Sequence, residues 1–195
     1  NNGWIYRWDV PHNIADLIEL MGGKEAFRNN LETMYNTPLG EAKYVFYAQL
    51  PDHTGNVGQF SMANEPSMHI PYLYNYIGEP WRTQKRVRTL LDEWFRNDLM
   101  GLPGDEDGGG MSAFVVFSML GFYPITPGLP IYVIGTPMFE RAVIETGAGK
   151  SFEVIAHNYS PTNKYIQSAK LNGKDWNQSW FCLLYTSPSP RDRTR

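Results

Sequence analysis

Apolar residues recur at helical spacing through the first two-thirds of the chain. The first stripe runs from Ile14 to Met21 and stops at the pair Gly22-Gly23, which is a typical helix end. A later stripe, Met111 to Leu120, is nearly all apolar and closes at Gly121, so we expect that helix to be buried on all sides. By the same periodicity, helices are predicted over 11–21, 24–35, 71–76, 80–95 and 111–120.

The pattern changes after about Pro124, where short β-prone runs alternate with Gly, Pro and Asn turns. Strands are predicted over 131–134, 142–145, 152–156 and 165–171. The fold class is therefore mainly α with a C-terminal region of antiparallel β strands. The opening segment, Asn2 to Trp8, carries aromatic residues at alternate positions and fits either a buried strand or a platform for a sugar ring. Of the two, the strand is favoured.

Composition narrows the classes of function. The 195 residues carry a net charge of −3, and only 19% are charged, which gives no basic footprint for nucleic acid. No apolar run approaches the roughly 20 residues of a membrane span, and no signal peptide is visible after Asn1. The single cysteine, Cys182, excludes an intramolecular disulfide. The six Trp and twelve Tyr would suit the apolar faces of sugars, although most of them belong in a core.

A glycine-rich stretch, 101–113, carries three consecutive carboxylates before the apolar helix. In an extended turn Asp105 and Asp107 would point to one side and Glu106 to the other. Two converging acids can activate a water as a general base. An EF-hand loop is excluded because Val116 would fill its twelfth position. A solvated acidic turn that caps the helix stays open as the alternative.

A second polar segment, Asn64-Glu65-Pro66-Ser67, lies among apolar residues. The side chains of Asn64 and Glu65 are oxygen donors that suit a hard cation such as calcium. Helix capping by Asn64 or Ser67, with His69 in the core, is an equally good interpretation.

Together these segments are far more specific than any of them alone. The strings Asn2-Gly-Trp-Ile-Tyr-Arg-Trp8, Asn64-Glu-Pro-Ser67 and Gly104-Asp-Glu-Asp-Gly-Gly-Gly-Met-Ser-Ala113 resemble glycoside hydrolase family 92, and the resemblance covers Asn1 to Phe181 in order. It implies part of an (α/α)6 catalytic barrel over residues 1–128 and a truncated β-rich segment over 129–181. It also implies a calcium-dependent exo-α-mannosidase, periplasmic or extracellular, that inverts configuration.

The resemblance further implies roles for individual residues. Asp105 and Asp107 match the general-base pair, and the general acid is a Glu expected just upstream of Asn1. The substrate would be an α-mannoside oligosaccharide or a glycoprotein glycan, such as an N-glycan or mannan. Expected contacts are Trp4, Glu65 and His69 with the substrate, and Asn64, Glu65 and Asp107 with Ca²⁺.

Residues 182–195 resemble the translation of a sequencing adapter, so we expect an artefactual, disordered tail; a genuine Ser/Pro/Arg-rich linker is the alternative. Two other functions stay open for residues 1–181. One is a different (α/α)6 glycosidase, such as a glucosidase or trehalase. The other is a carbohydrate-binding protein without catalysis, which would lack the upstream Glu.

Overall fold

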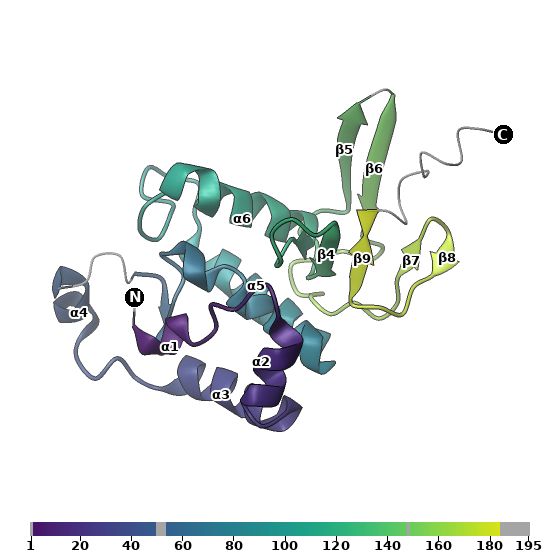
Figure 1. The fold of residues 1–195 in the computed structure, drawn as a ribbon. Helices are drawn as coiled ribbons and strands as arrows, with labels where there is room; N and C mark the ends of the chain where they lie inside the picture. Colours follow the sequence, from purple (N-terminus) through teal and green to yellow (C-terminus); the bar gives the residue numbers. More distant parts are fainter. Residues whose placement is uncertain (1, 50–53, 148, 184–195) are drawn as a thin grey trace.

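The computed structural model describes residues 2–49, 54–147 and 149–183, and it is a mixed helical and strand structure (Figure 1). The helices precede most of the strands along the chain. The helical elements are α1 (Gly3–Tyr6), α2 (Ile14–Leu20), α3 (Lys24–Asn36), α4 (Lys43–Gln49), the 3-10 helices η2 (Glu65–Ser67) and η3 (Ile70–Ile77), α5 (Pro80–Trp94), the 3-10 helix η4 (Asp107–Gly109) and α6 (Gly110–Leu120).

The strands form small antiparallel sheets. The largest contains three strands in the order β3-β4-β9, and the others are the pairs β1-β2, β5-β6 and β7-β8. Their bounds are β1 (Asn56–Val57), β2 (Phe60–Ser61), β3 (Phe122–Tyr123), β4 (Ile131–Ile134), β5 (Arg141–Gly147), β6 (Lys150–Ile155), β7 (Lys170–Leu171), β8 (Lys174–Asp175) and β9 (Trp180–Cys182).

Local sequence explains the helices that were predicted correctly. The Asn13 side chain accepts a hydrogen bond from the Asp16 N–H and so caps α2. Helix α6 ends at Gly121, which adopts a left-handed φ of 95°. The predicted helix over 71–76 is the longer 3-10 helix η3, in which Pro71 stands in the first turn.

Three expectations about elements are wrong. The opening segment forms the helix α1 instead of a strand, because the Asn2 side chain accepts hydrogen bonds from the N–H groups of Trp4 and Ile5. Of the strand predicted over 165–171, only Lys170–Leu171 forms. Helix α6 is not buried on all sides, since the side of the helix that carries Val116 is open and this residue is 57% exposed.

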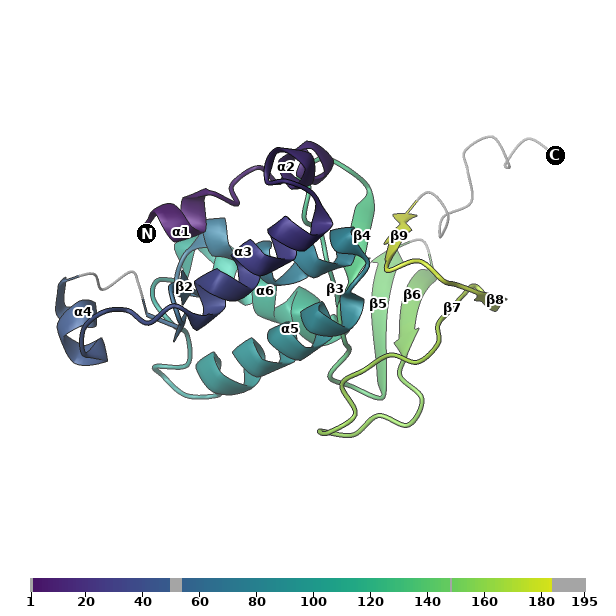
Figure 2. The same ribbon diagram turned by 90° about the horizontal axis from the view of Figure 1, so that it is seen from below.

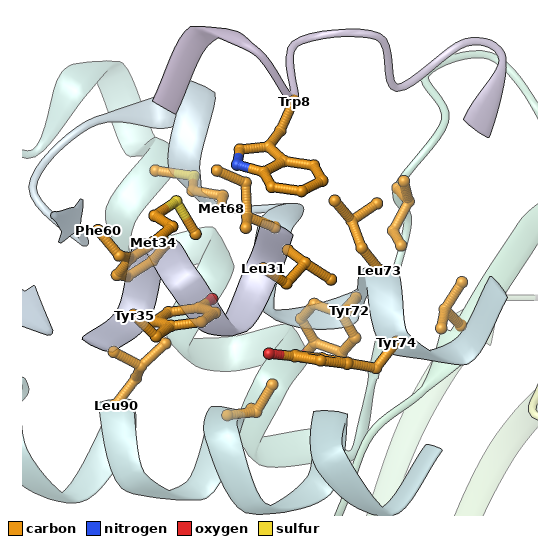
Figure 3. Close-up of a cluster of buried hydrophobic side chains, with 14 of the residues drawn as sticks. Trp8, Leu31, Met34, Tyr35, Phe60, Met68, Tyr72, Leu73, Tyr74 and Leu90 are labelled. Carbon is orange, nitrogen blue, oxygen red and sulfur yellow. The ribbon is translucent and has the colours of Figure 1, made fainter. Parts of the chain in front are cut away.

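The core lies between the segment after α1, the helix α3, η3 and α5 (Figure 3). Trp8 is fully buried and meets Phe27 edge-on, with the ring centroids 5.2 Å apart. Figure 3 shows Trp8 reaching from the segment after α1 toward Leu31. Large aromatic side chains such as this one dominate the energetics of a core, so Trp8 fixes the N-terminal segment on the helices.

The three-stranded sheet is attached to one end of the helices. The Asn75 side-chain amide in η3 donates hydrogen bonds to the carbonyls of Ile134 in β4 (2.8 Å) and Ser179 (3.0 Å). The Tyr72 ring stacks on Tyr123 of β3 at 5.1 Å. Both ribbon views place the strands β4 to β9 at this end, and α1 and α4 at the opposite end (Figures 1 and 2).

Strand β9 ends at Cys182, which is buried and pairs with Ile131 of β4. The next residue, Leu183, donates a backbone hydrogen bond to the Pro130 carbonyl at 2.9 Å. The described structure therefore extends two residues into the segment 182–195, for which disorder was expected, and the remaining residues, 184–195, lie outside the described residues. None of the described helices is long and apolar enough to cross a membrane.

Candidate functional site

The carboxylate loop, residues 101–110, packs tightly against the segment that follows β2. Gly104 has a φ of +83°, and a Cβ placed on it would lie 2.7 Å from the Cβ of Ala63 and 2.8 Å from its carbonyl oxygen. A Cβ on Gly55, in the turn before β1, would lie 3.1 Å from the Cβ of Pro103. Such short separations require glycine, so the loop is held against this segment by close backbone packing.

The three carboxylates of the loop are placed differently from the extended turn that was expected. Asp105 and Asp107 are exposed, and Asp107 begins η4 with a left-handed φ of 55°. A residue with a Cβ adopts this conformation at a cost of about 1–2 kcal/mol. Neighbouring Gly108 and Gly109 also have positive φ values, of 63° and 103°. The loop therefore turns sharply at Asp107 before it enters α6.

Glu106 is the residue that caps the following helices. One oxygen of its carboxylate accepts a hydrogen bond from the Gly109 N–H, and the other accepts one from the Ser112 N–H at 2.9 Å. Hydrogen bonds from the side chain and then the backbone of Ser112 hold the pKa of Glu106 below its ordinary value, with a smaller contribution from the Gly109 N–H. The acidic turn does cap α6, as the alternative interpretation proposed, but through Glu106.

The Asn64–Glu65 turn lies directly beside the carboxylate loop. Asn64 is extended, with φ −148° and ψ 147°, and Glu65 opens η2. A Cβ on Gly110 would lie 3.5 Å from the Cγ of Glu65 and 3.4 Å from the Cε of Met68. Asn64 is half-buried and Glu65 is exposed, whereas Ser67 is fully buried. The fold thus brings together two polar segments that are some 40 residues apart in the chain.

The N-terminal segment is joined to the same region. The Asn2 side-chain amide donates to Gln59 Oε1 at 3.2 Å, just before β2. Trp4 is half-buried, and the Arg7 guanidinium lies 4.8 Å from its ring centroid. Trp4 therefore has one ring face near a cation, and its role toward a sugar stays a prediction.

His69 is buried, and it lies close to the Asn64–Glu65 turn in the sequence. It is 6% exposed, and its Nε2 lies 2.7 Å from the carbonyl oxygen of Trp8, to which it donates a hydrogen bond. Burial lowers the pKa of His69, and the Trp8 carbonyl and Asp9 oppose this shift. This contact connects the segment after α1 to η3, and the expected contact of His69 with substrate stays a prediction.

The donor chemistry of the Asn64–Glu65 turn fits a hard cation, since it offers amide and carboxylate oxygens. Neither side chain has a hydrogen bond or ion pair to the residues that the structure describes, so both are available. Within residues 2–49, 54–147 and 149–183 there is no group of three or more His, Cys, Asp and Glu that could hold a metal ion. These residues would therefore fill only part of a coordination shell.

A sizeable cavity lies away from these residues. It has a volume of about 910 Å³ and lies between η3 and the strands, and Asn75, Trp176 and Trp180 are among its lining residues. Of the described residues that line it, none is a candidate site residue. The candidate site is accordingly an exposed surface formed by the carboxylate loop, the Asn64–Glu65 turn and the N-terminal segment. Sequence analysis missed Glu106 as an organiser of this surface, although an acidic residue just before an apolar helix was a usable signal.

Comparison with known proteins gives consistent matches. Residues 1–186 match the family model described as glycosyl hydrolase family 92 catalytic domain. An uncharacterized secreted glycosidase of Arthroderma benhamiae is 32% identical over 180 residues, which are 91% of this chain and 21% of that protein.

Solved structures agree with these sequence matches. The family GH92 α-mannosidase BT3965 from Bacteroides thetaiotaomicron, in complex with mannoimidazole, is 36% identical with a TM-score of 0.84, over 92% of this chain and 23% of that one. The family GH92 inverting mannosidase BT2199 from the same species is 36% identical with a TM-score of 0.78, over 93% of this chain and 25% of that one. The chain thus spans about a quarter of the length of the structures it matches.

Proposed function

The chain belongs to glycosyl hydrolase family 92, within the catalytic domain, and from this premise we propose that the protein carrying it is a calcium-dependent α-mannosidase that inverts configuration. One observation supports the proposal most strongly. The carboxylate loop packs against the Asn64–Glu65 turn, with Gly104 against Ala63 and Gly110 beside Glu65. The proposed general base and the proposed calcium ligands would thereby face the same sugar.

Asp105 and Asp107 are proposed as the general-base pair. Both side chains are exposed, so a water can reach them. An inverting hydrolase needs room for a water between its base and its acid, about 6.5–9.5 Å. The proposed acid is a Glu directly preceding Asn1, on the segment that Asn2 ties to Gln59.

Asn64, Glu65 and Asp107 are proposed to hold the calcium ion. When bound there, calcium would supply electrostatic stabilisation to the sugar in the site. Glu65, His69 and the half-buried ring of Trp4 would contact the same sugar. The substrate would be a terminal α-mannoside of an oligosaccharide or of a glycoprotein glycan, such as an N-glycan or mannan.

The proposed architecture follows the family. Residues 1–128 would form part of an (α/α)6 barrel and residues 129–181 the β-rich segment after it. A periplasmic or extracellular location is also proposed; the relative from Arthroderma benhamiae is named as secreted.

The proposal is tested with the complete gene product that contains this chain. We expect Asp105→Asn and Asp107→Asn each to lower kcat on an aryl α-mannoside by about 10²–10⁴-fold, with a smaller change in KM, because a general base acts in the transition state. The matched control is Asp175→Asn, since Asp175 is exposed in β8 among the strands, at the other end of the helices. Wild-type kcat in both loop variants would refute the base assignment. Binding of mannosides by the wild type without turnover would favour a carbohydrate-binding protein instead.

A further inference from the structure

Glu106, the middle acid of the loop, has no role in the proposed chemistry, yet its side chain and its backbone carbonyl accept three hydrogen bonds. The Glu106 side chain accepts from the N–H groups of Gly109 and Ser112, and its backbone carbonyl accepts from the Met111 N–H at 3.2 Å. Each of these three hydrogen bonds joins Glu106, which precedes Asp107, to a residue that follows Asp107. Asp107 is therefore enclosed by hydrogen-bonded turns.

Asp107 is held inside these turns in an unfavourable conformation. Among the described residues only Asp107, Asn158 and Asn172 combine a Cβ with a positive φ. The two Asn residues lie in surface turns, and Asn is the residue type that tolerates this conformation best. Asp107 is instead followed by Gly108 and Gly109, which are flexible, and its carbonyl accepts a hydrogen bond from the Gly110 N–H. The side chain of Glu106 spans this same part of the turn from the outside.

We infer that Glu106 is a positioning residue: its carboxylate, bound to the Gly109 and Ser112 N–H groups, fixes the turn at Asp107 and hence the place from which the Asp107 carboxylate acts. This inference rests on the proposed function, because it takes Asp107 to be part of the general base. Glu106 acts through Asp107 and needs no contact with the sugar. In the sequence, Glu106 stands directly before Asp107.

The effect on the reaction follows from geometry. A displacement of about 1 Å in a catalytic group can cost on the order of 10²-fold in rate. Removing the carboxylate frees Gly109 and Ser112, so that Asp107 leaves its left-handed conformation for part of the time. We expect Glu106→Ala to lower kcat by about 10- to 100-fold with KM nearly unchanged. Glu106→Gln keeps one acceptor oxygen and is expected to recover part of this loss.

A double-mutant cycle in the complete gene product provides the test, with aryl α-mannoside turnover as the readout. If Glu106 acts through Asp107, Glu106→Ala has little further effect in an Asp107→Asn background. The control Asn13→Ala also removes a side-chain helix cap, that of α2, and should lower the unfolding temperature without changing kcat.

Independent, multiplicative losses in the cycle would overturn the inference, as would wild-type kcat in Glu106→Ala. Failure of the proposed function gives a different result, because the single variant Asp107→Asn would then retain full activity. A crystal structure of Glu106→Ala gives a second measurement. A positive φ retained at an ordered Asp107 would also overturn the inference.

Discussion

The contact between Gly104 and Ala63 allows a quantitative prediction about the site. Gly104→Ala places a methyl group 2.7 Å from the Cβ of Ala63 and 2.8 Å from its carbonyl oxygen, where ordinary contacts are 3.4–4 Å. The left-handed φ of +83° adds about 1–2 kcal/mol, because a residue with a Cβ is strained there. Overpacking typically adds about 1–3 kcal/mol. Since the obstacle includes backbone, the carboxylate loop relieves the clash by moving.

Movement of the loop separates the proposed base from the Asn64–Glu65 turn. Since about 1 Å of misplacement can cost on the order of 10²-fold, we expect kcat of Gly104→Ala to fall by roughly that factor. Gly78→Ala is a closely matched control: its φ is +85°, and a Cβ there meets nothing within 4 Å. Gly78→Ala should incur the same cost of placing a Cβ at a positive φ, and its kcat should equal that of the wild type.

The assay compares the two variants in the complete gene product, with steady-state turnover of an aryl α-mannoside and thermal unfolding measured on the same samples. Both variants should unfold at a lower temperature than the wild type, and only Gly104→Ala should lose turnover. Wild-type kcat in Gly104→Ala, or equal losses of kcat in the two variants, would refute the reasoning that close packing of the loop positions the base.

Two further predictions concern calcium and pH. Chelation should abolish hydrolysis and added calcium should restore it, because Asn64 and Glu65 offer oxygen ligands; full activity in excess chelator would contradict this. Burial lowers the pKa of His69, so the unfolded state binds its proton more readily than the folded state does. The stability contributed by neutral His69 is therefore complete above its unfolded pKa of about 6.5 and is lost as pH falls through the folded pKa. Unfolding temperatures measured between about pH 8 and pH 5 should fall more steeply for the wild type than for His69→Gln; parallel curves would refute this assignment.

Much of the helical part could be predicted because its determinants are local. The stripe and the glycine stop of α2, and the apolar spacing of α3, are contained within each helix. The opening segment was misassigned because its alternating aromatic residues are also compatible with a strand. The helix cap supplied by the Asn2 side chain stabilises the helix instead. For α6, an all-apolar sequence indicated burial but could not indicate which side another element covers.

The site was predicted in its residues and not in its geometry. Motif resemblance singled out Asp105, Asp107 and Glu65, because they stand in short strings that resemble those of the family. Their proximity depends on Gly104 packing against Ala63, a contact between segments distant in sequence, which no periodicity reveals. The left-handed turn at Asp107 likewise depends on hydrogen bonds from beyond it, so an extended turn was the natural but incorrect expectation.

In the proposed function, this chain carries the general base of an inverting α-mannosidase. Time-resolved proton NMR of the hydrolysis of an aryl α-mannoside by the complete gene product tests this role, because only one mannose is released and its first anomer reports the stereochemistry before mutarotation. If Asp105 and Asp107 activate a water on the face opposite the leaving group, β-mannose appears first and α-mannose accumulates later. Appearance of α-mannose first would mean retention of configuration, and would contradict the general-base role given to these carboxylates.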